Sequence, residues 1–185
     1  INGAMALGRA IDDVIISAAT GTSLTGEDGT TSTAFPGGQT AATTAGGLTI
    51  AKLREAMQLL IAAEVDVDNE ALYCAIGAQQ HDDLLGQTQA ISLDFTNKPV
   101  LVDGRIRSFM GFNFIDSQRL ALSGTDRTAF CWAQSGLHLG IWNDITVNIS
   151  DRPDKSHSTQ VYVKGTFGAT RVEEEKVVAI TCSEA

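Results

Sequence analysis

The sequence predicts an α+β fold, because helical patterns precede residue 64 and strand patterns fill the last third of the chain. Apolar residues recur at helical spacing over 4–18 and 50–63. From residue 139 onward apolar and polar residues alternate instead, and valine and isoleucine are frequent. Helices grouped apart from strands are typical of α+β proteins rather than of alternating α/β units.

The composition fits one domain, or two small lobes that share a core. The chain has 185 residues, of which 43% are hydrophobic. Charged residues make up 19%, below the roughly 25% usual for soluble domains, which favours a surface largely covered by neighbouring molecules. The net charge of −9 argues against binding nucleic acid or anionic membranes, because phosphate contacts need clustered lysine and arginine. An acidic protein can still enclose nucleic acid, since containment needs no adhesion.

The cysteines and the first residues of the chain allow two further predictions, about the thiols and about the length of the polypeptide. Cys74, Cys131 and Cys182 each lie in an apolar run, and none forms a CxxC pair. An odd number of separated cysteines predicts buried free thiols in a reducing compartment rather than a disulfide framework. No apolar run approaches the ~20 residues of a membrane-spanning helix. Because the chain opens at Ile1 within a helical pattern, we expect the trailing part of a longer polypeptide.

The first helix is expected over residues 4–18, and Thr20-Gly21 is a natural stop. Residues 20–47 then hold many glycines and threonines. Glycine permits positive φ and threonine disfavours helix, so this stretch predicts an extended, partly mobile loop.

The second helix has the strongest local signature of the chain. Thr49 is a suitable N-cap, and Leu48 and Leu53 are placed to form a hydrophobic staple around it. The apolar stripe continues through Ala63. Further elements are expected in the order of a strand over 71–76, a helix over 78–85 closed by Gly86, and an irregular stretch over 87–104.

Strands follow to the end of the chain. In the first, Ile106, Met110, Phe112 and Phe114 share one face, and Arg105, Arg107 and Asn113 share the other. Later strands are expected over 128–133, 139–149, 161–167 and 177–182, with a charged turn over 171–176. In the strand over 139–149, one parity carries Leu139, Ile141, Ile145, Val147 and Ile149.

The sequence contains no pattern for catalysis, cofactor binding or metal binding. The histidines, His81, His138 and His157, have no partner at ligand spacing. No serine lies in a Gly-x-Ser-x-Gly motif, so nothing supports a hydrolase. We therefore predict that the protein is not an enzyme and needs no cofactor.

With these elements in order, the chain resembles the major capsid proteins of tailed bacteriophages, which share the Hong Kong 97-type fold. The resemblance rests on the sequence of segments rather than on one motif. It departs from the family at Gly77-Ala78-Gln79-Gln80, where a proline-bearing turn is usual. The matching segments are 5–13 with 26–29, 48–63 with 70–85, 106–120, 147–150, 168–169 and 177–180.

The resemblance implies a peripheral lobe, made of a long helix with antiparallel strands, and an axial lobe, made of a sheet flanked by helices. Residues 1–47 would supply the peripheral helix and the loop, 48–148 the axial lobe, and 149–185 the returning peripheral strands. The family's N-terminal arm and extended hairpin loop precede the spine helix and are not found in this sequence.

The resemblance also implies function and partners. Copies of the chain would form pentamers and hexamers of an icosahedral shell around double-stranded DNA, without sequence-specific binding. Scaffold, portal or decoration proteins are further expected partners, the host cytoplasm is the expected place of assembly, and the virion is the final location. Candidate subunit-interface residues are Arg105, Arg107, Trp142, Glu173, Glu174 and Glu175. For the two arginines, a salt bridge to an acidic neighbour within the chain is the alternative.

Two other functions remain open. An encapsulin-type compartment shares the fold but holds cargo enzymes. A β-rich surface binding module would instead use residues 20–47 as a recognition loop, and it predicts a stable monomer with a ligand-sized pocket.

Overall fold

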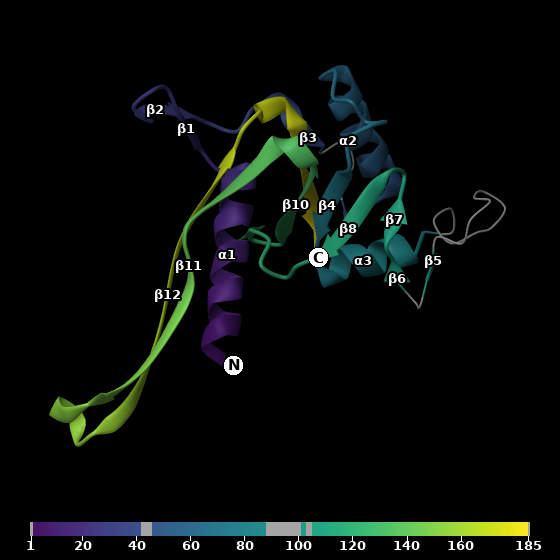
Figure 1. Ribbon diagram of the computed structural model, residues 1–185. Helices are drawn as coiled ribbons and strands as arrows, with labels where there is room; N and C mark the ends of the chain where they lie inside the picture. The colour runs from purple at the N-terminus through teal and green to yellow at the C-terminus, as the bar shows by residue number, and fades with distance from the viewer. Residues whose placement is uncertain (1, 42–45, 88–100, 103–104, 185) are drawn as a thin grey trace.

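The computed structural model describes residues 2–41, 46–87, 101–102 and 105–184, and confirms the α+β class (Figure 1). Its α-helices are α1 (Asn2–Thr20), α2 (Ile50–Ala62) and α3 (Ala78–Leu85). Its shorter strands are β1 (Ser23–Thr25), β2 (Thr31–Thr33), β3 (Thr40–Ala41), β4 (Leu72–Ile76), β5 (Leu101–Val102), β6 (Arg105–Ile106), β7 (Ser108–Phe109), β8 (Phe112–Asp116) and β9 (Leu122–Ser123). The longer strands are β10 (Asp126–Ala133), β11 (Leu137–Arg152), β12 (Ser158–Arg171) and β13 (Val177–Ser183).

A mixed sheet in the order β3-β13-β10-β4-β8-β7 forms the centre of the molecule, and β9 pairs with β10. Its middle strands are buried on both faces, which explains their nearly continuous apolar sequences. The predicted burial of the cysteines is confirmed: Cys74, Cys131 and Cys182 are free and buried, and Cys131 lies opposite Cys74. Burial raises the pKa of Cys182 to about 12, so this thiol stays protonated and unreactive.

The predicted start of α2 is confirmed. The hydroxyl of Thr49 accepts a hydrogen bond from the backbone N–H of Lys52 at 3.4 Å, and Leu48 and Leu53 are both fully buried. The backbone N–H of Leu48 also donates to the carboxylate of Asp83 on α3 at 2.9 Å. The residues that begin α2 therefore also connect it to α3.

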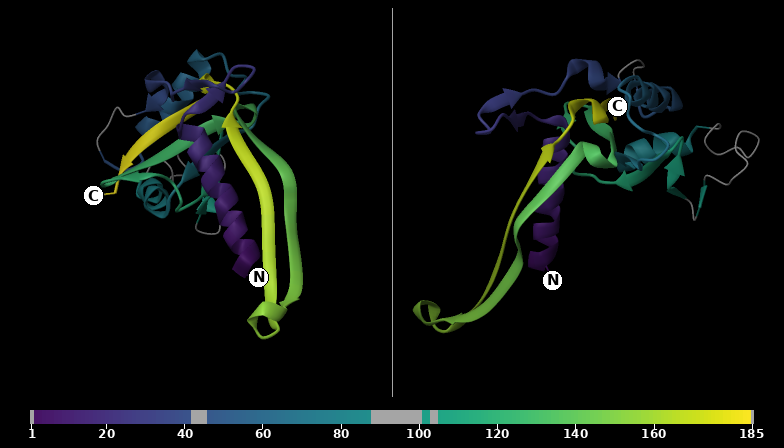
Figure 2. Two further views of the ribbon diagram at one scale, coloured as in Figure 1. Left: turned by 90° about the vertical axis from the view of Figure 1, so that its left-hand side faces the viewer. Right: turned by 45° about the horizontal axis from the view of Figure 1, so that its top comes forward.

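A long hairpin of β11 and β12 projects from the sheet beside α1 (Figures 1 and 2). The helix packs mainly on β12, where glycine allows a close approach: a Cβ at Gly165 would lie 3.3 Å from Leu7. A 16-residue strand spans about 53 Å, whereas a 19-residue helix spans about 28 Å. The far part of the hairpin therefore extends past the helix, as Figure 2 shows.

Two expectations about strands need correction. The single strand expected over residues 105–114 is broken by a two-residue turn at Met110 and Gly111, both with positive φ, which reverses the chain between β7 and β8. The alternating pattern of β11 holds only in part, because its register with β12 shifts between Ile141 and Thr146. Such irregularities change which residues share a face.

Several expectations about loops can also be compared with the structure. Part of the loop expected over 20–47 forms the β1–β2 hairpin, and residues 42–45 lie outside the described residues. Most of the irregular stretch expected over 87–104 lies outside them too. The boundary expected after residue 148 falls inside β11, and β13 pairs with β10 in the central sheet rather than with β12. The segment 149–185 therefore contributes to two different sheets.

A partly buried ionic cluster connects residue Glu184, near the end of the chain, to the central sheet. Arg127 on β10 donates to the backbone carbonyls of Gln118 and Leu120, both at 3.1 Å, and forms a bidentate pair with Glu184. The amide of Gln80 on α3 donates to the same carboxylate at 3.1 Å. These hydrogen bonds, first from Arg127 and then from Gln80, lower the pKa of Glu184 below its ordinary 4.5.

Glu184→Gln is expected to lower the free energy of unfolding at neutral pH. In the variant, this free energy should also decrease less as the pH falls. Because the folded pKa of Glu184 is lowered, its contribution is present above the ordinary value of 4.5 and is lost as the pH falls through the folded value. Urea unfolding at a series of pH values measures this. The gap between wild type and variant should close in acid, whereas Glu27→Gln, at an exposed turn, should leave the pH profile unchanged. A gap that does not vary with pH would contradict the prediction.

Candidate subunit interface

Arg105 and Arg107 lie on the exposed edge formed by β6 and the segment that leads to β7. Arg105 forms an ion pair with Asp116 on β8 at 3.6 Å, as the alternative for this residue anticipated. Both side chains are about half exposed or more, 69% and 46%, so the pair adds little stability. Arg105 and Asp116 border a hollow of about 290 Å³ that His81 also lines. The guanidinium groups therefore remain available at the surface.

Trp142 lies on β11 with 86% of its surface exposed. The register passes from Ile141 opposite Phe167 to Asn143 opposite Thr166, so Trp142 has no partner on β12. The other tryptophan, Trp132, is instead packed between Tyr73 and Phe130, with ring centroids 5.5 Å and 5.0 Å away. Of the two, only Trp142 has the exposure that an interface anchor needs.

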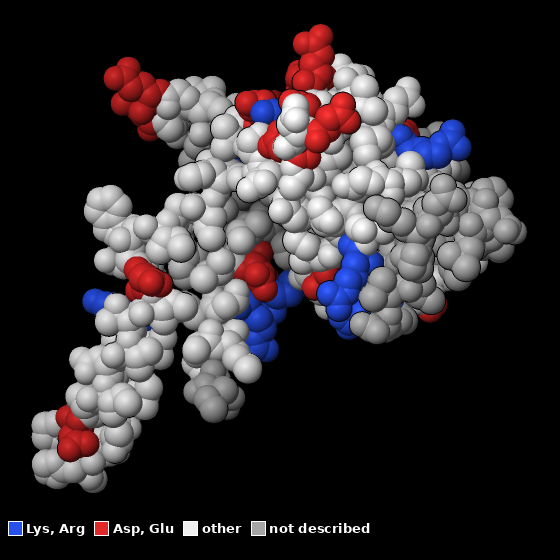
Figure 3. All heavy atoms as spheres, turned by 45° about the vertical axis from the view of Figure 1, so that its right-hand side comes forward, with Lys and Arg blue, Asp and Glu red and all other residues white. Residues whose placement is uncertain are grey.

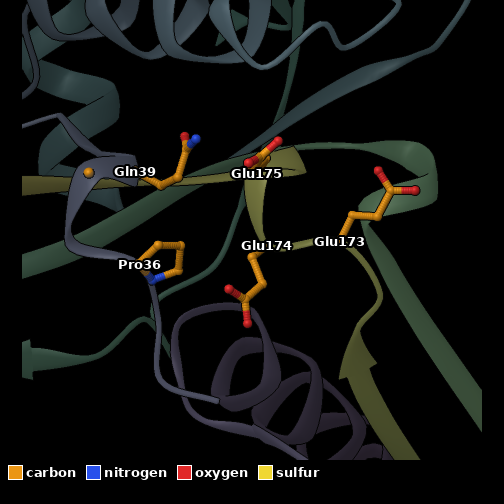
Figure 4. A pocket seen from close by; sticks show the side chains of 6 residues that line it. Pro36, Gln39, Glu173, Glu174 and Glu175 are labelled. Carbon is orange, nitrogen blue, oxygen red and sulfur yellow. The ribbon is translucent and has the colours of Figure 1, made fainter. Parts of the chain in front are cut away.

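The three glutamates form a short turn after β12, Glu173 followed by the 3-10 helix η4 (Glu174–Lys176). With Pro36 and Gln39 they line an open hollow of about 430 Å³ (Figure 4). Figure 4 shows the carboxylate of Glu174 directed toward α1, away from that of Glu175. Ion pairs within the chain hold Glu173 to Lys176 at 3.1 Å and Glu174 to Arg171 at 3.8 Å. The Glu175 side chain is exposed, which leaves its carboxylate open to a partner.

Arg171 is a buried residue that sequence reasoning missed. Its Nη1 donates to the backbone carbonyls of Ala19 at 3.1 Å and Gly21 at 2.9 Å, at the end of α1, and its guanidinium lies 5.1 Å from the ring centroid of Phe35. Burial lowers the pKa of Arg171, and Glu174 opposes that shift. A signal was present in the sequence, because Arg171 shares the parity of Val163 and Gly165, which lie close to Gly3 and Leu7 of α1.

The structure does not bring the six predicted interface residues together. The arginines lie near α3, Trp142 lies on the hairpin, and the glutamates lie at the turn after it. In Figure 3, several acidic side chains lie at the top of the molecule around a basic one, and larger basic groups lie lower down and to the right, with acidic side chains beside some of them. Among the residues the structure describes, no cluster of histidine, cysteine and carboxylate groups is placed to hold a metal ion. No described helix is long and apolar enough to cross a membrane.

Comparison with known families identifies the family of the chain. A sequence model of a family described as phage capsid protein matches residues 2–184. The chain belongs to this phage capsid family. The predicted family is thus confirmed, and its members are structural proteins of the capsid. No curated protein matches the sequence of this capsid protein.

Solved structures confirm the Hong Kong 97-type fold of the capsid protein. A structure of Mycobacterium phage Che8 aligns with 97% of the chain at a TM-score of 0.66 and 19% identity, and a cyanophage Pam1 capsid structure aligns with 97% at 0.68 and 15%. A holo-SrpI encapsulin complex from Synechococcus elongatus PCC 7942 aligns with 98% at 0.57 and 11%. The chain spans 61% of the Che8 chain, 66% of the Pam1 chain and 65% of the encapsulin chain.

Proposed function

We propose that the capsid protein assembles, through pentamers and hexamers of itself, into an icosahedral shell that encloses double-stranded DNA without reading its sequence. The observation that carries the proposal is the β11–β12 hairpin. Ile141, Val147 and Ile149 on β11 are 57%, 53% and 67% exposed, together with Trp142 at 86%. A soluble monomer rarely exposes so many large apolar side chains on one element, so this surface is suited to cover by neighbouring copies.

The proposal includes the lobes and partners that the family implies. The hairpin and α1 would form the peripheral lobe, and the central sheet with α2 and α3 the axial lobe. Scaffold, portal and decoration proteins are proposed partners during assembly in the host cytoplasm and in the virion. In this proposal the protein has a structural role in the shell and catalyses no reaction. Its net charge of −9 would repel packaged DNA and keep the DNA free to move during filling.

Charged patches of opposite sign support contacts between copies. Arg107 lies on one edge of the subunit and Glu175 at the turn after β12, and both side chains are exposed. Because their charges are opposite and they lie on different elements, they are suited to meet across an interface between two copies. Head-to-tail contacts between unlike surfaces generate closed rings when the rotation from one copy to the next closes.

Reversal of one charge, in Arg107→Glu or Glu175→Arg, is expected to slow assembly at low salt. Like charges would then face each other, and added salt should reduce the defect because it screens exposed groups. Light scattering during assembly measures the rate. The double variant restores opposite charges and should recover part of the rate. If the double variant assembled as slowly as the two single-variant defects predict when added together, the pairing of Arg107 with Glu175 would be contradicted.

The proposed shell is tested by negative-stain electron microscopy and light scattering on the full-length protein expressed in bacteria. Closed shells or rings of five and six subunits would support it. Enclosed protein cargo in place of DNA in native particles would favour an encapsulin-type compartment. A monomer at every concentration would favour the β-rich binding module instead.

A further inference from the structure

An irregular stretch of β11 exposes an aromatic and an acidic side chain two residues apart. The register with β12 passes from Asn143 opposite Thr166 to Thr146 opposite Lys164, so Asp144, like Trp142, has no partner residue on the neighbouring strand. Both side chains are exposed. Bulges redirect side chains out of the regular sheet pattern, and exposed tryptophans are frequent anchors of protein interfaces.

An apolar pocket lies between α2 and the turn that joins β7 to β8. It measures about 400 Å³, and its lining residues are Arg54, Met57, Gln58, Ile61, Ala62 and Met110. Ile61 is 55% exposed within it. Methionine side chains adapt to irregular shapes and contact aromatic rings favourably, so this pocket suits a flat apolar group. The exposed Arg54 places a cation at its rim.

The turn beside the pocket is held in an uncommon conformation. Met110 has a φ of 52°, in the left-handed region that most side chains avoid. The following Gly111 lies close to the pocket, since a Cβ there would be 3.3 Å from the Cε of Met57. Asparagine or glycine would fit the Met110 backbone with less strain, so the methionine at this position is explained by its side chain rather than by the turn.

The hairpin and the elements that line the pocket lie on different sides of α1 (Figure 1). Figures 1 and 2 show β11 and β12 on one side of α1, and α2 with β7 on the other. One copy therefore cannot place its own Trp142 into its own pocket. A contact between these surfaces must join two copies head to tail, which is the type of contact that closes a ring.

We propose that Trp142 of one copy inserts into the Met57–Ile61–Met110 pocket of the next copy, with Asp144 beside Arg54. The indole would fill the apolar pocket, and the carboxylate would pair with the cation at its rim. Charge complementarity favours this orientation, because no hydrogen bond or ion pair to Arg54 is found among the described residues and the carboxylate of Asp144 accepts a hydrogen bond there only from the backbone N–H of Ile145. The inference rests on the proposed self-assembly and names a contact that would serve it.

Cross-linking of the full-length protein tests the contact with Trp142 in place. In the double variant Asp144→Cys and Arg54→Cys, a short bismaleimide should link successive copies into a ladder that ends at five or six subunits. Each single variant should give no ladder, since the chain's own described cysteines are buried. Addition of Trp142→Ala to the double variant should abolish the ladder.

A double-mutant cycle tests the energetic coupling. Trp142→Ala and Ile61→Ala are each expected to raise the protein concentration needed for assembly, the first by about tenfold or more. If the two residues share one contact, the combined variant should assemble no worse than Trp142→Ala alone. Leu122→Ala, which removes a residue 54% exposed on β9, is the matched control and should change little.

The outcomes separate this inference from the proposed shell. If wild-type protein forms no shells or rings, the proposed function fails. If wild type assembles but the cysteine pair gives no ladder, the docking of Trp142 is overturned while the shell stands. Defects of Trp142→Ala and Ile61→Ala that multiply in the combined variant would also overturn it, because the residues would then act at separate places. Unfolding curves of each unassembled variant confirm that the subunit still folds.

Discussion

Replacement of Lys52 by methionine should lower the free energy of unfolding by about 3 kcal/mol. The side chain of Lys52 is only 1% exposed, and its ammonium group donates to the backbone carbonyls of Gly46 and Thr181, both at 2.7 Å. Methionine fills a similar volume but cannot donate. Two partly buried carbonyls would lose their charged donor, and α2 would lose this hydrogen bond to β13.

Urea unfolding of the unassembled protein measures the effect. Lys164→Met, on the exposed surface of β12, is the matched control, because it removes the same charge from a place in contact with water. Its change should stay within about 0.5 kcal/mol. Equal midpoints for the two variants would show that the ammonium of Lys52 contributes no more than a surface lysine, and the prediction would then be wrong.

Local signals in the sequence were sufficient where the structure depends on neighbouring residues. Thr49 caps α2 as predicted, because a capping hydroxyl and its backbone N–H partner lie three residues apart. The burial of Cys74 and Cys131 followed from apolar runs that fit a strand buried on both faces. These features need little information from distant parts of the chain.

Local signals failed where distant segments decide the outcome. The alternation in β11 indicated that its two faces differ, but Val147 and Ile149 are exposed, because α1 ends before it reaches the far part of the hairpin. The turn at Met110 escaped prediction since methionine is unusual in a left-handed position. A sequence pattern identifies which residues form an apolar face of a strand, but it does not show which other part of the protein packs against that face.

The candidate interface shows the same limit. The ion pair of Arg105 with Asp116 was an anticipated alternative, whereas Trp142 is exposed and its role as an interface anchor stays a prediction. The complement of each residue would lie on another copy of the chain, so no pattern in the neighbouring sequence points to it. Buried charges such as Arg127 were missed, because a charged residue in a strand usually indicates the solvent face.

Arg171 should be the second strongly stabilising charge, and Arg171→Met should lower the free energy of unfolding by about 3 kcal/mol. Only 4% of Arg171 is exposed, and its guanidinium satisfies carbonyls at the end of α1, where a helix leaves several without partners. Methionine would leave those carbonyls buried and unpaired. It would also remove the cation from the ring of Phe35.

The position of Arg171 makes its effect local as well as global. Since Arg171 joins β12 to the end of α1, amide hydrogen exchange in the variant should rise first in the last turn of that helix and in the β1–β2 hairpin that follows. Arg152→Met is the matched control, because this arginine lies near the hairpin tip, is 44% exposed and pairs only with Asp154 nearby. Equal unfolding midpoints for Arg171→Met and Arg152→Met, or faster exchange at the hairpin tip alone, would show that α1 is held to the hairpin by its apolar contacts and not by this guanidinium.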